Sequence, residues 1–165
     1  MTKIHQNEII KNQLINQAFQ IEALLKRYID IHNRRLKSAG TFTSLFRKVN
    51  FEEIYRETEE LQGSFREKMG EIFVMRKDFS KYTLLQQNFF DTLNAYFSAL
   101  FEAVEMLYQI TKRQYDLSQG LGKTKLTLLE NLNLERKYQE KERAYYALGG
   151  RLNETFDCMK QEAFG

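Results

Sequence analysis

Apolar residues recur every three or four positions along most of the chain, the spacing expected when one face of an α-helix is buried. The first such run ends at Gly40, which can adopt the left-handed conformation that stops a helix. Its apolar members are Ile10, Leu14, Ala18, Ile21, Leu25, Tyr28 and Leu36. The pattern predicts a first helix over residues 2–38.

A second apolar repeat starts after Asn50, and Glu53 three residues later completes the pattern of a helix-capping box. The connector before it can itself be helical from Ser44. The members of the repeat are Phe51, Ile54, Leu61, Phe65, Ile72, Met75 and Phe79. The sequence predicts a second helix that begins at residue 44 or residue 50 and ends at residue 79.

The second repeat continues in phase as far as Ile110, so the apolar pattern also fits one uninterrupted helix. Such a helix would be about 100 Å long at 1.5 Å per residue, far beyond the usual length in globular proteins. We therefore expect a turn between Asp78 and Thr83, where Ser80 or Thr83 can cap the next helix.

The third predicted helix, over residues 81–118, is the most apolar, and its apolar face covers about half of its circumference. The Gly120–Gly122 segment ends it, and Thr124 can cap a fourth helix over residues 124–163. Gly149-Gly150 inside the fourth helix predicts a kink or a close helix crossing. The residues of the fourth helix expected to face inward are Leu129, Leu132, Tyr138, Tyr145, Leu148, Leu152, Phe156 and Met159.

Four helices of similar length with short connections predict an all-α fold, a single antiparallel up-down-up-down four-helix bundle with long helices. A single domain spanning residues 1–165 is expected, because this length suits one sizeable core. The chain has no proline and eight glycines, which favours long helices, and 42% hydrophobic residues, which excludes general disorder. The predicted core includes Leu25, Leu100, Val104 and Leu152.

The single cysteine, Cys158, excludes an intramolecular disulfide framework and a cysteine-rich zinc site. It fits a reducing compartment, and we expect an inert thiol because no base is evident beside it. No signal peptide and no transmembrane segment is recognisable in the sequence. A cytoplasmic protein is therefore expected.

No catalytic constellation, metal site or cofactor site is predicted. The Gly-Lys-Thr triplet at Gly122 resembles the end of a phosphate-binding P-loop, but the glycine required five residues earlier is Leu117. His32 lies close to the apolar line of its helix, so its ring should point inward rather than accept a phosphoryl group. A di-iron bundle needs glutamate three residues before histidine, and neither His5 nor His32 has one. We expect a protein that is not an enzyme.

A row of aromatic residues follows one flank of the third predicted helix. This spacing is most often found in a core, and the alternative is a face that binds a partner helix or a second copy of the chain. The row consists of Phe90, Phe97, Phe101, Tyr108 and Tyr115. Because the third helix has more apolar arc than three neighbours easily cover, self-association or pairing with another helical subunit is predicted.

Positive charge concentrates in two segments that the predicted topology brings to one end of the bundle. Residues 34–48 contain five cations and no acid, and residues 112–125 contain four cations and one acid, so this end carries +8 although the net charge is only +3. The helix dipole favours cations at helix C-termini, but it does not account for those near the predicted helix starts. The candidate anion-binding residues are Arg34, Arg35, Lys37, Arg47, Lys48, Lys123 and Lys125.

These patterns lead to two functional hypotheses. The first is a non-enzymatic helical interaction module, an adaptor or a subunit of a larger assembly, that binds protein through its helical faces. The alternative is binding of a polyanion, either nucleic acid or an acidic membrane surface, through the basic end of the bundle.

Overall fold

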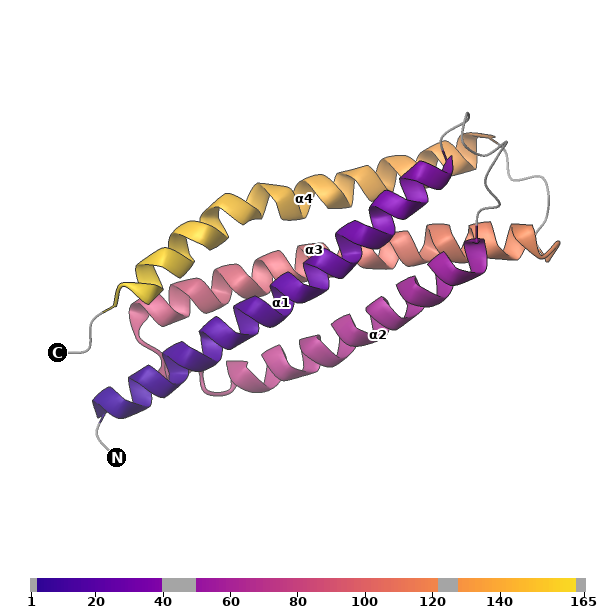
Figure 1. The fold of residues 1–165 in the computed structure, drawn as a ribbon. Coiled ribbons are helices and arrows are strands. Elements are labelled where there is room, and N and C mark those ends of the chain that lie inside the picture. Colours follow the sequence, from indigo (N-terminus) through magenta and orange to yellow (C-terminus); the bar gives the residue numbers. More distant parts are fainter. Residues whose placement is uncertain (1–2, 40–49, 122–127, 163–165) are drawn as a thin grey trace.

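A computed structural model describes residues 3–39, 50–121 and 128–162. It contains four helices, α1 (Lys3–Ala39), α2 (Phe51–Arg76), α3 (Leu84–Ser118) and α4 (Leu128–Lys160), and a short 3-10 helix η1 (Phe79–Lys81) between α2 and α3. No strand occurs in these three ranges. Successive helices run in opposite directions, so α1 and α3 end where α2 and α4 begin (Figure 1). The predicted all-α helical bundle is confirmed.

The predicted helix boundaries agree with the structure to within a few residues wherever they can be compared. The side chain of Asn50 accepts a hydrogen bond of 3.1 Å from the backbone N–H of Glu53, so Asn50 caps α2 as predicted. Two other predicted helix starts, at Ser44 and Thr124, lie outside the described residues.

The predicted turn between the second and third helices is confirmed. Thr83 caps α3, because its hydroxyl accepts from the backbone N–H of Gln86 at 3.3 Å and the Gln86 side chain accepts from the Thr83 N–H at 3.1 Å. Thr83 rather than Ser80 is therefore the cap. At the other end of α3, Gly120 has a φ of 71° and stops the helix as a left-handed residue.

The core is organised around α3, which packs against all three other helices. In Figure 1 α1 crosses obliquely over α3. The backbones of α1 and α4 make little close contact, and side-chain hydrogen bonds join the two helices. Leu100 and Val104 are fully buried as predicted, whereas Leu25 and Leu152 are only partly buried at the edge of the core. The apolar side chains of α3 that are 0% exposed are Phe89, Leu100, Ala103, Val104 and Leu107.

Several expectations about side-chain position are wrong. Leu36 and Leu132 continue their apolar repeats but are exposed, because the repeat defines a face without showing how far the neighbouring helices extend along it. A close helix crossing at Gly149-Gly150 is also wrong, because a Cβ atom built on either glycine meets nothing within 4 Å, whereas the kink expected as the alternative stays a prediction.

The uncovered apolar arc predicted for the third helix is absent. Among the described residues, the exposed large apolar side chains of α3 are Leu84 and Leu117, at its two ends. The wide apolar face is instead shared by three neighbours within the same chain. No helix in the described ranges is both long enough and apolar enough to cross a bilayer.

Candidate functional site

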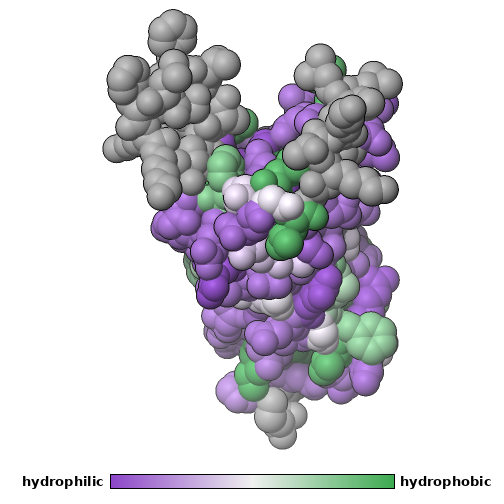
Figure 2. Space-filling view, turned by 90° about the vertical axis from the view of Figure 1, so that its right-hand side faces the viewer, coloured by the Kyte–Doolittle hydropathy of each residue, from purple (hydrophilic) through white to green (hydrophobic). Residues whose placement is uncertain are grey.

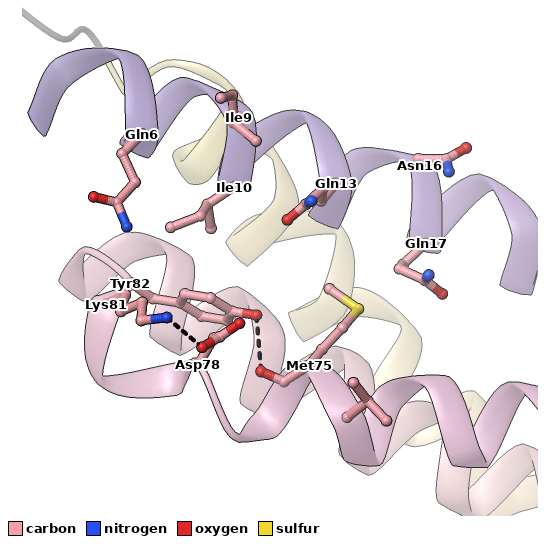
Figure 3. A pocket seen from close by; sticks show the side chains of 11 residues that line it. Gln6, Ile9, Ile10, Gln13, Asn16, Gln17, Met75, Asp78, Lys81 and Tyr82 are labelled. Carbon is pink, nitrogen blue, oxygen red and sulfur yellow. Dashed lines mark hydrogen bonds and ion pairs between the residues drawn. The ribbon is translucent and has the colours of Figure 1, made fainter. Parts of the chain in front are cut away.

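A groove lies between the N-terminal half of α1 and the end of α2 with the turn that follows it. Its volume is about 490 Å³. Figure 3 shows Ile10, Gln13 and Gln17 on α1 facing Met75 of α2 and Tyr82 of the α2–α3 turn. The groove is lined by Gln6, Ile9, Ile10, Gln13, Asn16, Gln17, Val74, Met75, Asp78, Lys81 and Tyr82.

The α2–α3 turn provides a fixed wall for this groove. The buried Tyr82 donates its hydroxyl hydrogen to the Met75 carbonyl at 3.1 Å, and its ring packs on Phe79 at 5.9 Å. Burial raises the pKa of Tyr82, so this hydroxyl stays a neutral donor. Asp78 and Lys81 form an ion pair of 2.6 Å, so their two opposite charges compensate each other.

Carboxamide side chains dominate the α1 wall. Each carboxamide offers N–H donors and a carbonyl acceptor without net charge. The Gln17 amide donates to Glu71 Oε2 at 3.2 Å, but its Oε1 atom is buried and has no hydrogen-bond partner among the described residues. Hydrogen bonds from Lys68 and from Gln17 lower the pKa of Glu71, which holds this carboxylate ionised.

Two apolar side chains stand exposed on opposite walls of the groove. Ile9 of α1 is 37% exposed and Val74 of α2 is 59% exposed. With the paired Asp78 and Lys81, the groove combines apolar contact area, neutral hydrogen-bonding groups and balanced charge. The lining residues of this groove include no nucleophile paired with a base.

A second cluster of polar side chains joins α1 to α4. The hydroxyl groups of Tyr28 and Tyr138 are 2.7 Å apart, and His32 Nδ1 lies 2.6 Å from the Tyr138 hydroxyl. Tyr28 also donates to Glu142 at 3.1 Å, and His32 Nδ1 is 3.4 Å from the same carboxylate oxygen. Four side chains from two helices thus form one connected network.

The network is extended by a charged pair at one end. Arg35, only 2% exposed, contacts both carboxylate oxygens of Glu135, at 2.7 and 3.1 Å, and its guanidinium carbon lies 5.3 Å from the centre of the Tyr138 ring. A bidentate pair of this kind fixes the register of the two helices as well as stabilising them. Tyr145 packs edge-on against the Tyr28 ring, with 5.9 Å between the ring centres.

Burial sets the protonation state of this cluster. It lowers the pKa of His32, although the Glu142 carboxylate acts in the opposite direction, and it raises the pKa of the Tyr28 and Tyr138 hydroxyls. His32 is therefore neutral at neutral pH. The expectation that His32 points inward is confirmed, and we interpret the cluster as the connection that holds α1 against α4.

Two of the predicted anion-binding residues form ion pairs inside the protein. Arg34 pairs with Asp30 at 3.0 Å, with Glu53 at 3.5 Å and with Glu57, and Arg35 is the partner of Glu135. Figure 2 looks onto this end of the bundle, where hydrophilic side chains dominate the coloured surface. The remaining candidates have side chains outside the described residues, namely Lys37, Arg47, Lys48, Lys123 and Lys125. Anion binding stays a prediction.

The predicted aromatic row packs against α2. Phe90 and Phe97 are buried core residues, and Phe97 stacks on Phe65 at 5.1 Å. Phe101 stacks on the same ring at 5.9 Å, and Tyr108 and Tyr115 lie 5.8 and 5.1 Å from the ring of Tyr55. A role in partner binding stays a prediction for the half-buried Phe101, Tyr108 and Tyr115.

Sequence reasoning missed the groove because its carboxamides look like an ordinary solvated helix face. It also missed the pairing of Tyr28 with Tyr138, although polar tips on inward-facing positions of two helices were a usable signal. No group of three or more possible metal-ligating side chains occurs among the described residues. Comparisons of the chain with models of protein families, with curated proteins and with solved structures found no match.

Proposed function

We propose that this chain is a non-enzymatic helical interaction module, an adaptor or a subunit of a larger assembly, and that it binds an extended segment of a partner protein in the α1–α2 groove. The observation that carries the proposal is that exposed Ile9 and Val74 line the same groove as the neutral carboxamides of α1. The cytoplasm is the proposed compartment, and the unpaired Cys158 supports it.

The spacing of the carboxamides supports an extended partner. Gln13 and Gln17 are one helical turn apart, about 6 Å along the α1 axis. Two residues of an extended strand span about 6.6 Å, so successive backbone amides on one edge of a peptide repeat at nearly the same distance. The exposed Gln13 carboxamide can both donate a hydrogen bond to the backbone of such a segment and accept one from it.

Charge supports a neutral stretch of peptide rather than a polyanion. Asp78 and Lys81 balance each other at the edge of the groove, and Glu71 beside Gln17 is engaged by Lys68. An apolar side chain of the partner would insert between Ile9 and Val74 and remove their exposed surface from water, at about 25 cal/mol per Å² of apolar area buried.

The proposal is tested by capturing partners from the native cell with and without nuclease treatment. Wild type is compared with the double variant Ile9→Glu/Val74→Glu. The matched double variant, Leu121→Glu/Leu132→Glu, changes two apolar residues that are also exposed, at the other end of the bundle. We expect a protein that is retained by wild type and by the matched variant, is lost by the groove variant, and is insensitive to nuclease.

Circular dichroism of both variants checks that the fold is intact, which we expect because all four side chains are exposed. The proposal is wrong if a folded groove variant keeps the partner, or if the matched variant loses it instead. Loss of all captured material on nuclease treatment favours the polyanion alternative.

A further inference from the structure

A second cavity lies on a different side of the bundle, between α1, α3 and α4. Its volume is about 280 Å³, and most of its lining is apolar, including four aromatic rings. Phe19 is 57% exposed at its edge and packs edge-on against Phe156, with 6.4 Å between the ring centres. The residues of the cavity are Ala18, Phe19, Ile21, Glu22, Leu25, Phe89, Leu93, Tyr96, Gly149, Leu152, Asn153 and Phe156.

Side-chain bridges on both sides of this cavity hold α1 and α4 in place. Towards one end of the bundle, Tyr28 of α1 contacts Tyr138 and Glu142 of α4. Towards the other end, the Lys11 ammonium group donates to the backbone carbonyls of Lys160 and Glu162, at 2.7 and 2.9 Å. The two helices are thus tied by polar contacts on either side of the cavity while their backbones remain apart.

Gly149 keeps the cavity open from the α4 side. Glycine in a helix interior costs about 1 kcal/mol relative to alanine, so its presence there calls for a reason. Crowding is not the reason, because a Cβ atom at Gly149 would meet nothing within 4 Å, and its backbone does not adopt a positive φ. A larger side chain at this position would instead project into the cavity that Gly149 lines.

We propose that this cavity is a binding site for a small uncharged apolar molecule, aromatic or alkyl, of roughly a dozen non-hydrogen atoms. The size follows from the volume of about 280 Å³, roughly twice that of an enclosed apolar cavity that binds benzene, although this cavity is partly open to solvent. The chemical class of the ligand follows from the lining of the cavity, since binding sites for small apolar molecules are formed mainly by apolar and aromatic side chains. Of the polar lining residues, Asn153 is uncharged and Glu22 pairs with Lys26 at 2.6 Å, so the two charges of that pair sum to zero.

The test ligand is n-butylbenzene, which has about ten carbon atoms. Its binding is measured by calorimetry and by chemical-shift changes of the protein's methyl resonances in NMR spectra. Wild type should bind it with the largest shifts at Leu93 and Leu152, which line the cavity, and with little change at Leu61 in the core beside α2. Gly149→Leu should weaken binding at least tenfold. Gly150→Leu, one residue further along α4 and outside the cavity lining, should change affinity less than twofold.

Both leucine variants replace glycine in the same helix, so both gain helix propensity and only one fills the cavity. Gly149→Ala provides a milder variant, because its Cβ atom has space, and should weaken binding by a smaller factor than leucine does. The proposal is overturned if wild type does not bind n-butylbenzene, or if Gly149→Leu binds it as well as wild type.

Sedimentation with and without n-butylbenzene separates a ligand cavity from a surface covered by a second copy of the chain. An unchanged association state upon binding supports the proposal. Dissociation of a wild-type dimer by n-butylbenzene would show that the cavity is occupied by the second copy, and the proposal would be wrong. None of these outcomes depends on the groove between α1 and α2.

Discussion

Leu100 and Leu132 both occupy positions where the apolar repeat predicts burial, but their surroundings differ. Leu100 is 0% exposed in the middle of α3, whereas Leu132 is 56% exposed near the start of α4. Leu100→Ala should lower the free energy of unfolding by about 2 to 5 kcal/mol, since it leaves a cavity in a close-packed core. Leu132→Ala should change it by less than about 0.5 kcal/mol.

Urea denaturation followed by circular dichroism measures both differences. Because the two substitutions remove the same atoms, their difference reports burial alone. Similar losses of stability for the two variants would contradict the central position of α3.

His32 should make stability depend on pH. Its pKa is lowered from 6.5 mainly by burial, while Arg35 acts in the same direction and Glu142 and Glu135 oppose it. As pH falls through 6.5, the unfolded chain takes up a proton that the folded protein resists, so the free energy of unfolding decreases. The decrease stops once pH is below the pKa of His32 in the folded state, and above the unfolded value the contribution is constant.

The free energy of unfolding of wild type, His32→Gln and His5→Gln, measured between pH 5 and pH 8, tests this prediction. His32→Gln should flatten the decrease on acidification, by at most about 1.4 kcal/mol per pH unit for one proton. His5 is exposed, and its replacement should leave the wild-type profile unchanged. Identical slopes for wild type and His32→Gln would show that the histidine does not titrate with folding.

At the scale of an element, the start of α3 depends on a single side chain. Thr83→Ala removes the hydroxyl that accepts from the Gln86 N–H, and it should cost about 1 kcal/mol of stability. Ser80→Ala is the matched control, because the exposed Ser80 lies in η1 and does not cap the helix. Thermal unfolding of both variants measures the difference, and an equal loss for Ser80→Ala would mean that the cap is shared.

The elements themselves could be predicted well from the sequence. Apolar spacing identified four helices, and short-range chemistry at Asn50, Thr83 and Gly120 marked their ends, because caps depend on residues within one turn. The turn between α2 and α3 is an instructive case. The apolar repeat runs through it in phase, so only the length of an uninterrupted helix and the available caps indicated that the chain reverses there.

The candidate sites could not be predicted in the same way, because they depend on the register between helices. Tyr28 and Tyr138 were recognised as inward-facing, but their hydrogen bond requires a relative shift of α1 and α4 that no local pattern contains. Likewise, Gln13 and Gln17 become part of a groove only because the α2–α3 turn lies opposite them. The glycine at position 149 predicted a kink or a close helix crossing, yet the space around it is open and no helix crosses there.

At the scale of the whole molecule, the topology brings the ends of α1 and α3 together with the starts of α2 and α4 (Figure 1). The sequence segments rich in cations begin at this end, as predicted from the order of the helices. Ion pairs with carboxylates reduce what some of these cations can contribute to binding a polyanion. Arg34 and Arg35 are held by carboxylates of α1, α2 and α4, so neither is expected to release bound counterions from a nucleic acid.

Polyanion binding, the alternative function, would therefore depend on Lys37 and on the four cations near the predicted helix starts, Arg47, Lys48, Lys123 and Lys125. For wild type, we expect the affinity for duplex DNA to fall by roughly 0.9 log units per log unit of salt for each phosphate neutralised. Changing these four residues together to Gln should reduce the slope of log affinity against log salt concentration by about three to four log units per log unit. Arg34→Gln should leave the slope unchanged, because its charge is already paired within the protein. If wild type binds neither duplex DNA nor anionic vesicles at low salt, or if the quadruple variant binds them equally well, this end of the bundle is a solvated surface and the alternative function is wrong.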